Sequence, residues 1–197
     1  MAADQLQAIV RACPWMMSVL RAARVCAPSD WWVGGGVLRD LVWDRLHGDF
    51  DPARVKDVDL AFYDPLDLSH AREVELERAL AARLPDVTWD AKNQAAVHLW
   101  YQRRFGVVEV APLLSAADGV ATWPETATVV AVRLCVDDSL EVLAPCGVAD
   151  LLGGVCRRNP LESSRGGMAA DRLDHQGREG TWWTHACVGW RRYEQIR

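Results

Sequence analysis

Hydrophobic positions near the start of the chain recur at the spacing of amphipathic helices. They predict helices over Asp4–Cys13 and Pro14–Cys26, and Pro14 suits a first helical position because the N–H that it lacks would have no helical partner there. The apolar run Trp31–Val33 predicts a strand, and the glycine triplet after it predicts a sharp bend into a helix over Val37–His47, whose apolar residues share one side. We expect the first two helices to form a packing layer.

Strand and helix patterns continue through the middle of the chain. They predict a strand, a helix with Ser69 as its N-cap, a strand, a helix and a less regular strand, in the order Val55–Tyr63, Ser69–Leu84, Val87–Ala91, Asn93–Tyr101 and Gly106–Leu114. Further along, the β-rich runs Ala127–Val136 and Leu140–Ala144 flank the turn-forming triplet Asp137–Ser139. This arrangement predicts a β-hairpin.

The composition, 50% hydrophobic and 25% charged over 197 residues, is typical of a soluble globular protein with one sizeable core. No apolar stretch approaches the roughly 20 residues that span a bilayer, and the N-terminus does not resemble a secretory signal, so we expect a cytoplasmic protein that does not enter the membrane. We expect one domain over residues 1–160. Residues 161–197, rich in Arg, Gly and Trp, lack helical or strand periodicity and predict an atypical, disordered or divergent tail.

The net charge and the cysteine spacing argue against a non-specific DNA-binding protein and against a protein with a cysteine zinc site or redox dithiol. A formal charge of −5 disfavours non-specific DNA binding, which depends on clustered Lys and Arg that neutralise phosphates. The six cysteines are scattered singly, without the close spacing of a zinc site or a redox dithiol. We expect them to be free thiols, mostly in the core.

Two short motifs carry the candidate chemistry. The glycines Gly35 and Gly36, between a strand and a helix, allow backbone N–H groups to approach a phosphate, and the helix N-terminus adds a partial positive charge. Asp57 and Asp59 lie two apart on a predicted strand and therefore point to the same side. Two such carboxylates repel each other unless a cation lies between them, which indicates a divalent metal.

Each motif alone is weak, because a glycine triplet is often only a tight turn and alternating acids often line a solvated edge strand. Together they form the layout that metal-assisted nucleotidyl transfer requires. In this order, Gly35-Gly36 and Asp57-Val58-Asp59-Leu60 resemble the signature of the DNA polymerase β-like nucleotidyltransferase superfamily, in which a third acid lies on a later strand. The gap of 20 residues between Gly36 and Asp57 is longer than usual there. The segment Gly35–Asp40 also resembles the opening of bacterial tRNA CCA-adding enzymes and poly(A) polymerases.

A closer resemblance covers the chain to about Pro160. Successive motifs resemble a family of uncharacterised bacterial nucleotidyltransferase-like proteins: Trp31–Gly48, Asp57–Pro65, Trp89–Ala95, His98–Tyr101, Trp123–Thr128 and Ala144–Leu151. The resemblance implies an α+β nucleotidyltransferase fold, a small mixed β-sheet flanked by helices. That family usually continues with a basic helix containing tryptophan, which is not recognisable here after Pro160. Either the tail is divergent or the reading frame has shifted.

The resemblance also implies a third carboxylate. Asp90, in the β-like run Val87–Ala91, occupies the position where the family has an acid, and Glu109 in Val108-Glu109-Val110 is the rival. Either acid can instead be an ordinary surface residue on a strand.

Several neighbouring residues are candidates to bind the nucleotide. Lys92 can contact a triphosphate and Asn93 can contact a base or sugar edge. Arg39, one turn into its helix, can approach the phosphates, or it can form a surface ion pair with Asp40 or Asp44. Trp89 and Trp100 can stack on a base, although large aromatic residues are more often part of the core. His98 is a candidate acid–base group, although a structural histidine held by a hydrogen bond is the more typical role.

The implied function is transfer of a nucleotidyl group from an NTP such as ATP to an acceptor hydroxyl, dependent on Mg²⁺ or Mn²⁺. Asp57, Asp59 and Asp90 would be the metal-binding catalytic residues, and Gly35, Gly36 and Arg39 would hold the phosphates. The acceptor is open: a small molecule, an RNA or a protein. Two alternatives remain, an enzyme similar to tRNA CCA-adding enzymes or poly(A) polymerases, and a catalytically silent nucleotide- or partner-binding module.

Overall fold

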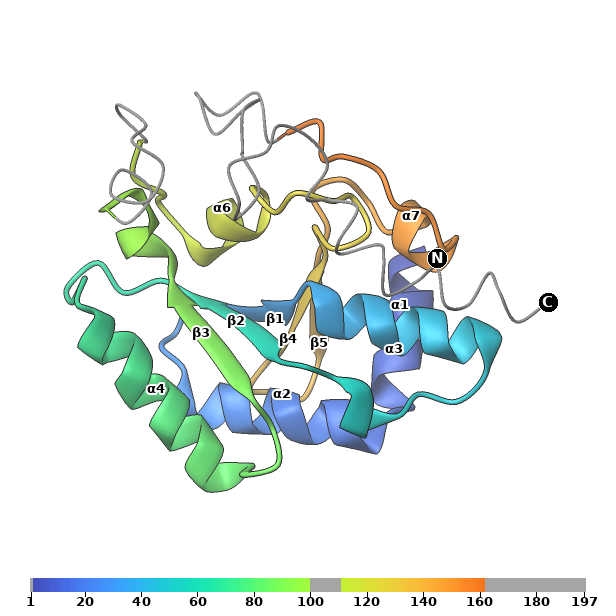
Figure 1. Ribbon diagram of the computed structural model, residues 1–197, viewed down its shortest axis with the longest axis horizontal. Helices are drawn as coiled ribbons and strands as arrows, with labels where there is room; N and C mark the ends of the chain where they lie inside the picture. Colours follow the sequence, from blue (N-terminus) through green and yellow to red (C-terminus); the bar gives the residue numbers. More distant parts are fainter. Residues whose placement is uncertain (1, 100–110, 162–197) are drawn as a thin grey trace, which may run out of the picture.

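The computed structural model describes residues 2–99 and 111–161, which fold around one five-stranded sheet (Figure 1). The strands are β1 (Trp31–Gly34), β2 (Val58–Phe62), β3 (Trp89–Asn93), β4 (Ala131–Leu134) and β5 (Leu140–Leu143). The helices are α1 (Ala2–Arg11), α2 (Pro14–Cys26), α3 (Gly36–His47), α4 (His70–Arg83), α6 (Ala116–Val120) and α7 (Ala149–Leu152), and two 3₁₀ turns are η1 (Pro52–Arg54) and η2 (Gln94–Ala96). None of the helices in these ranges has the length and apolar character needed to cross a membrane.

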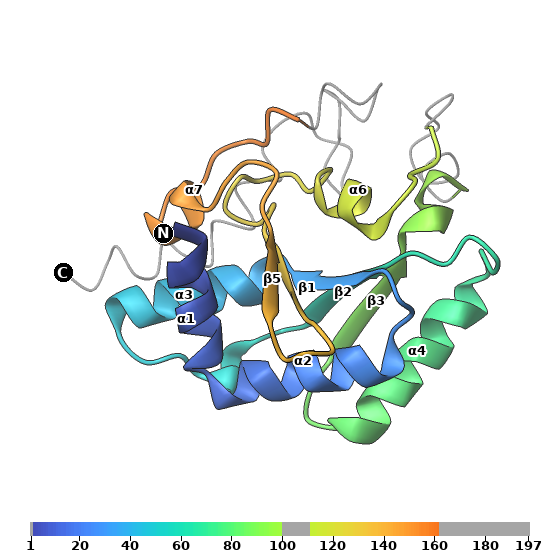
Figure 2. The ribbon, with the colours of Figure 1, turned by 180° about the vertical axis from the view of Figure 1, so that it is seen from behind.

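The sheet is mixed, with the strand order β3-β2-β1-β4-β5. Strand β1 is antiparallel to both β2 and β4, and β4 and β5 form the predicted hairpin, whose turn lies against α2 (Figure 2). Strand β3 runs parallel to β2, because α4 returns the chain to the same end of the sheet before β3 begins. The predicted α+β architecture, a small mixed sheet flanked by helices, is confirmed.

The boundaries of β2 differ from the prediction. The strand begins at Val58 rather than Val55, because the preceding residues form η1 and its exit. The first cross-strand hydrogen bond runs from the Val58 N–H to the Thr88 carbonyl, at 2.8 Å. Asp57 therefore lies immediately before the strand and Asp59 lies within it.

Three predicted elements after α4 need correction. Strand β3 continues through Asn93, which pairs with Phe62, so the helix predicted from Asn93 begins later: the 3₁₀ turn η2 follows the strand, and residues 97–99 are helical. The segment 111–114 is not a strand, and residues 106–110 of that prediction lie outside the described residues. Strand β4 begins only at Ala131, because the preceding residues turn back to hydrogen-bond the Glu125 carbonyl.

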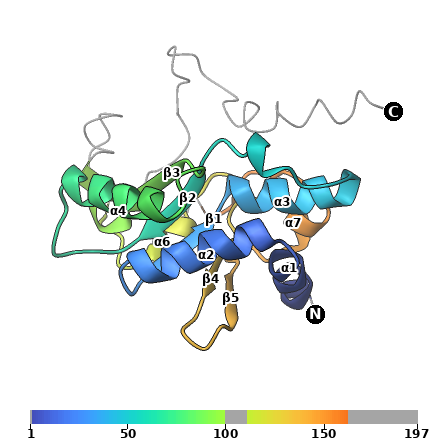
Figure 3. The same cartoon turned by 90° about the horizontal axis from the view of Figure 1, so that it is seen from below.

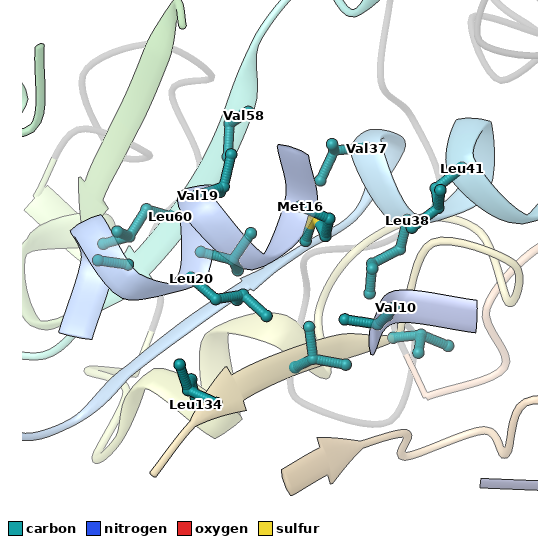
Figure 4. Packing of buried hydrophobic residues seen from close by; sticks show 14 of the residues in the cluster. Val10, Met16, Val19, Leu20, Val37, Leu38, Leu41, Val58, Leu60 and Leu134 are labelled. Atoms are coloured by element: carbon teal, nitrogen blue, oxygen red, sulfur yellow. The ribbon is translucent and has the colours of Figure 1, made fainter. Parts of the chain in front are cut away.

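The two faces of the sheet carry two apolar clusters. The larger one packs helices α1 to α4 against one face, and Figure 4 shows Met16 of α2 beside Val37 of α3. Each fully buried Leu or Met of this kind contributes about 1.5–3 kcal/mol. The smaller cluster joins Trp32, Ala61 and Ala131 of the opposite face to α6. Helix α6 thus covers part of the opposite face, on the side where Asp59 lies.

The outer edge of β3 is held by α4, which runs along it (Figure 3). Glu77 Oε1 accepts the Ala91 N–H at 3.0 Å, and Glu73 Oε1 accepts the Asn93 N–H at 2.9 Å. The two glutamates are four residues apart, so one helix face presents both carboxylates to alternate N–H groups of the strand. These contacts fix β3, and with it Asp90, relative to α4.

Candidate active site

The site is built around the glycine turn between β1 and α3. Gly35 has φ +68°, a backbone conformation that glycine adopts without the strain felt by other residues. A Cβ atom at this position would also lie 2.9 Å from Asp59 Oδ2 and 3.4 Å from Trp123 Cζ3. The turn therefore packs directly on Asp59, which places the glycine motif and the acidic motif at one location.

The backbone N–H groups of the turn are already used within the protein. The Gly35 N–H donates to the Val130 carbonyl at 3.1 Å, and the Gly36 N–H donates to the Asp59 carboxylate. The expected contact of these N–H groups with a phosphate stays a prediction, in which they would have to exchange these partners for it. The glycines instead bring the N-terminus of α3 close to Asp59, where the helix dipole favours negative charge.

Asp59 lies between two neighbours in the sheet, opposite Gly34 of β1 and opposite Asp90 of β3. Burial, together with the charges of Asp57 and Asp90, raises the pKa of its carboxyl group to about 7, against the smaller opposing effects of the Gly36 N–H and the Lys92 ammonium. Three carboxylates thus repel one another here in the absence of a bound cation.

Asp57 and Asp90 differ in their surroundings. Asp57 is exposed, just before β2, and acts on Asp59 through its charge. Asp90 lies beside Asp59 on β3, and its Oδ1 contacts the Lys92 Nζ. Asp90 therefore has the position expected of the third acid, whereas the rival Glu109 lies outside the described residues.

The chemistry of these donors fits a hard divalent cation, because carboxylate oxygens are its preferred protein ligands and a cation would relieve the repulsion at Asp59. Within residues 2–99 and 111–161, however, no three His, Cys, Asp or Glu side chains are arranged to hold a metal together. In this arrangement the Lys92 ammonium contacts the carboxylate of Asp90, the acid expected to complete the set.

Arg39 lies at the N-terminal end of α3, near the turn. Its Nη2 is 3.8 Å from the place of a Cβ on Gly36, and its guanidinium is 5.8 Å from the ring centroid of Trp43. It also donates from Nε and Nη2 to Asp40 Oδ1, at 3.0 and 2.9 Å. Arg39 therefore forms the expected ion pair with Asp40. It also lies close to the helix N-terminus, where the contact with phosphates is expected.

Asn93 does not have the surroundings of a nucleotide ligand. It is 1% exposed, and its Nδ2 donates to the Asp64 and Asp67 carbonyls at 2.8 and 2.9 Å. Its Oδ1 accepts the N–H groups of Asp64 and Ala95 at 3.0 and 3.1 Å. All four hydrogen-bonding positions of the amide are occupied, so Asn93 holds the loop after β2 instead of reading a base or sugar edge.

Replacing Asn93 with alanine should lower the free energy of unfolding by about 2–4 kcal/mol, because buried main-chain groups lose their partners. Denaturant unfolding measures this loss. If the Asn93→Ala protein is as stable as the wild type but binds nucleotide more weakly, Asn93 does not hold the loop after β2. The expectation that it contacts a base or sugar edge would then be supported.

The remaining candidates are the aromatic residues Trp89 and Trp100 and the histidine His98. Trp89 is 8% exposed and belongs to the main core, the structural alternative for this residue. Trp100 lies outside the described residues. His98 Nδ1 is buried without a hydrogen-bond partner among the described residues, so the structural hydrogen bond expected of His98 is not present at that atom.

The sequence did not indicate that Trp123 contacts the glycine turn at Gly35. Trp123, directly after α6, approaches the turn at Gly35, and its carbonyl accepts a hydrogen bond from the Asn159 Nδ2 at 2.8 Å. The same Nδ2 donates to the Ala121 carbonyl at 2.8 Å, and Asn159 is 1% exposed. No periodic pattern indicates a contact between segments so far apart in the chain.

Replacing Gly35 with alanine should destabilise the protein by about 3 kcal/mol, because strain at positive φ is added to a close approach to Asp59. Gly147→Ala is the matched control, since Gly147 also has positive φ but has no atom within 4 Å of its added Cβ. That control should cost only about 1 kcal/mol. Equal losses in the two variants, measured by denaturant unfolding, would contradict the packing of the turn on Asp59.

Comparison with known proteins agrees with this geometry. A family model described as nucleotidyltransferase matches residues 21–184. A solved NMR structure described as revealing a CCA-adding enzyme head domain is 27% identical, with a TM-score of 0.64, and the match covers 83% of this chain and 88% of that one. No curated protein matches the chain.

Proposed function

Because this chain belongs to the nucleotidyltransferase family whose model spans residues 21–184, we propose that it moves a nucleotidyl group from an NTP to an acceptor hydroxyl, with Mg²⁺ or Mn²⁺ as cofactor. The observation that supports this proposal most is the packing of the Gly35 turn on Asp59, beside Asp90. A phosphate-attracting helix terminus and a group of carboxylates then meet at one point.

The residues have distinct roles in this proposal. Asp57 and Asp59 would hold the cation, and Asp90 would complete its carboxylate ligands. When bound, the cation supplies charge neutralisation at the phosphates and activation of the attacking oxygen. The N-terminus of α3 and the guanidinium of Arg39 attract the phosphates, which helps to orient the α-phosphorus for attack and pyrophosphate for departure. Lys92 and Asn93 are not assigned to the nucleotide, because their side chains are engaged within the protein.

A second candidate function is terminal addition of nucleotides to RNA. It is favoured by the likeness to the structure described as a CCA-adding enzyme head domain. The formal charge of −5 argues against an extended contact with an RNA backbone, so a small acceptor fits better. A catalytically silent binding module is the third possibility, and the three adjacent carboxylates argue against it.

A turnover screen tests the proposal. The full chain is incubated with each of the four NTPs, Mg²⁺ or Mn²⁺, and acceptor pools of small molecules, proteins and RNA that includes tRNA without its 3′ end, and pyrophosphate release is measured. Release that requires both cation and acceptor, and that Asp59→Asn abolishes, would support the proposal. Release with only the truncated tRNA would favour the second function, and nucleotide binding without turnover in any pool would favour the silent module.

We further propose that the catalytic unit ends near Pro160. The end of the described chain is tied to the core by the Asn159 N–H, which donates to the Pro124 carbonyl, and by the Arg157 carbonyl, which accepts the Thr126 N–H, both at 2.8 Å. A chain that ends at Leu161 should therefore keep its free energy of unfolding within about 1 kcal/mol of the full chain. A large drop in melting temperature would show that residues 162–197 contribute to the core.

A further inference from the structure

Among the described residues, Lys92 is the only positively charged side chain that lowers the pKa of Asp59. It lies between two groups of acids. It lies two residues after Asp90 on β3, so the two side chains emerge on the same side of the strand. Its Nζ contacts Asp90 Oδ1 and lies 3.8 Å from Oε1 of Glu77 on α4. The ammonium group thus stands between an acid of the candidate site and an acid outside it.

Glu77 provides a fixed second position for that ammonium. Its Oε1 accepts the Ala91 N–H at 3.0 Å, which holds the carboxylate beside β3 whether or not Lys92 contacts it. The Lys92 side chain is 44% exposed, so its flexible stem can reorient toward Glu77 without disturbing the core. The pair of carboxylates therefore offers Lys92 two alternative partners.

On the basis of the proposed function, we propose that Lys92 is an internal counter-ion that neutralises Asp90 in the metal-free protein and moves to Glu77 when a divalent cation binds. An ammonium and a divalent cation repel each other at contact distance, so a cation that binds Asp90 weakens the contact of Lys92 with the same carboxylate. With Lys92 on Asp90, the site presents only Asp57 and Asp59. With Lys92 on Glu77, all three carboxylates face the cation.

This role differs from direct contact between Lys92 and a triphosphate. A counter-ion acts on cation binding in the complete absence of nucleotide, whereas a phosphate ligand acts only on nucleotide binding. Mn²⁺ alone is therefore the appropriate probe. Its binding to the full chain is measured from the electron paramagnetic resonance signal of the free ion, at about 0.15 M salt to screen distant charges.

Three variants separate the contributions of the two partners. Lys92→Met should bind Mn²⁺ about tenfold more tightly, because the competing ammonium is removed. Glu77→Gln keeps an acceptor for the Ala91 N–H but removes the second position, so it should bind Mn²⁺ several-fold more weakly. In the double variant, Glu77→Gln should reduce Mn²⁺ affinity far less than it does in the protein that has Lys92, because there is then no ammonium group for Glu77 to bind.

The outcomes distinguish this inference from the proposed function. Mn²⁺ binding by the wild type that Lys92→Met leaves unchanged or weakens would overturn the counter-ion role alone. Equal effects of Glu77→Gln with and without Lys92 would also overturn it, because Glu77 would then act only as a distant charge. Failure of both the wild type and Lys92→Met to bind Mn²⁺ would contradict the metal-dependent function as well.

Discussion

Replacing Asp59 with asparagine is expected to abolish nucleotidyl transfer, by at least about a thousand-fold in kcat, while the protein remains folded. The side chain keeps its size and an oxygen that can accept the Gly36 N–H, but it loses the charge that would hold the cation. Charge stabilisation by a metal is worth several kcal/mol in the transition state, which corresponds to about this factor in rate. Initial rates of pyrophosphate release at saturating NTP measure the loss.

Asp44→Asn is a matched control, because Asp44 is another aspartate with a local partner, Arg54, and lies on α3 away from the acid group. It should retain the wild-type rate within about twofold, since the ion pair of Asp44 with Arg54 does not involve the acid group of the candidate site. A folded Asp59→Asn protein with unchanged turnover would refute the assignment of Asp59. Loss of turnover in both variants would point to a general defect in folding.

The stability of the cation-free protein should fall as the pH rises from about 4 to 7. The pKa of Asp59 is about 7 in the folded protein and near its ordinary value of 3.8 in the unfolded chain, so the folded state binds the extra proton in this interval. Stability therefore decreases with pH by about 1.4 kcal/mol per unit, for up to about 4 kcal/mol in all, and levels off above pH 7. Below pH 4 both states are protonated at this group.

The measurement compares wild type with Asp59→Asn in a chelating buffer, so that the other titrating groups cancel in the difference. The free energy of unfolding of the variant should rise relative to that of the wild type between pH 4 and 7. Above pH 7 the variant should be more stable by up to about 4 kcal/mol. Addition of Mg²⁺ should reduce that gap, because a bound cation stabilises the ionised carboxylates of the wild type. A constant difference across the interval would mean that Asp59 titrates normally.

Local sequence signals predicted much of the fold. The apolar spacing of the first helices, the strand–glycine–helix unit and the Asp137–Ser139 turn each depend on a few adjacent residues, and the structure contains all of them. The juxtaposition of Gly35 and Asp59 also followed from the order of the two motifs. Such features are encoded over short distances, where periodicity and turn chemistry dominate.

Features that depend on distant partners could not be predicted in this way. Strand β2 begins where the Thr88 carbonyl becomes available, and Asn93 is a strand residue because β2 pairs with it. The approach of Trp123 to the turn depends on Asn159, which lies far along the chain. The engagement of Asp90 by Lys92 and Glu77 likewise requires α4 to lie against β3. Each is a tertiary contact without a local signature.

The two glutamates of α4 have a consequence for self-association. An edge strand normally offers unpaired N–H groups to a strand of another molecule, which is a common origin of aggregation. Along β3, Glu73 and Glu77 occupy two of these groups, and a foreign strand would have to displace both carboxylates from the N–H groups that they accept. This side of the sheet is therefore protected from strand addition, and the two side chains that fix β3 beside α4 also keep the protein from pairing with other copies of itself at this edge.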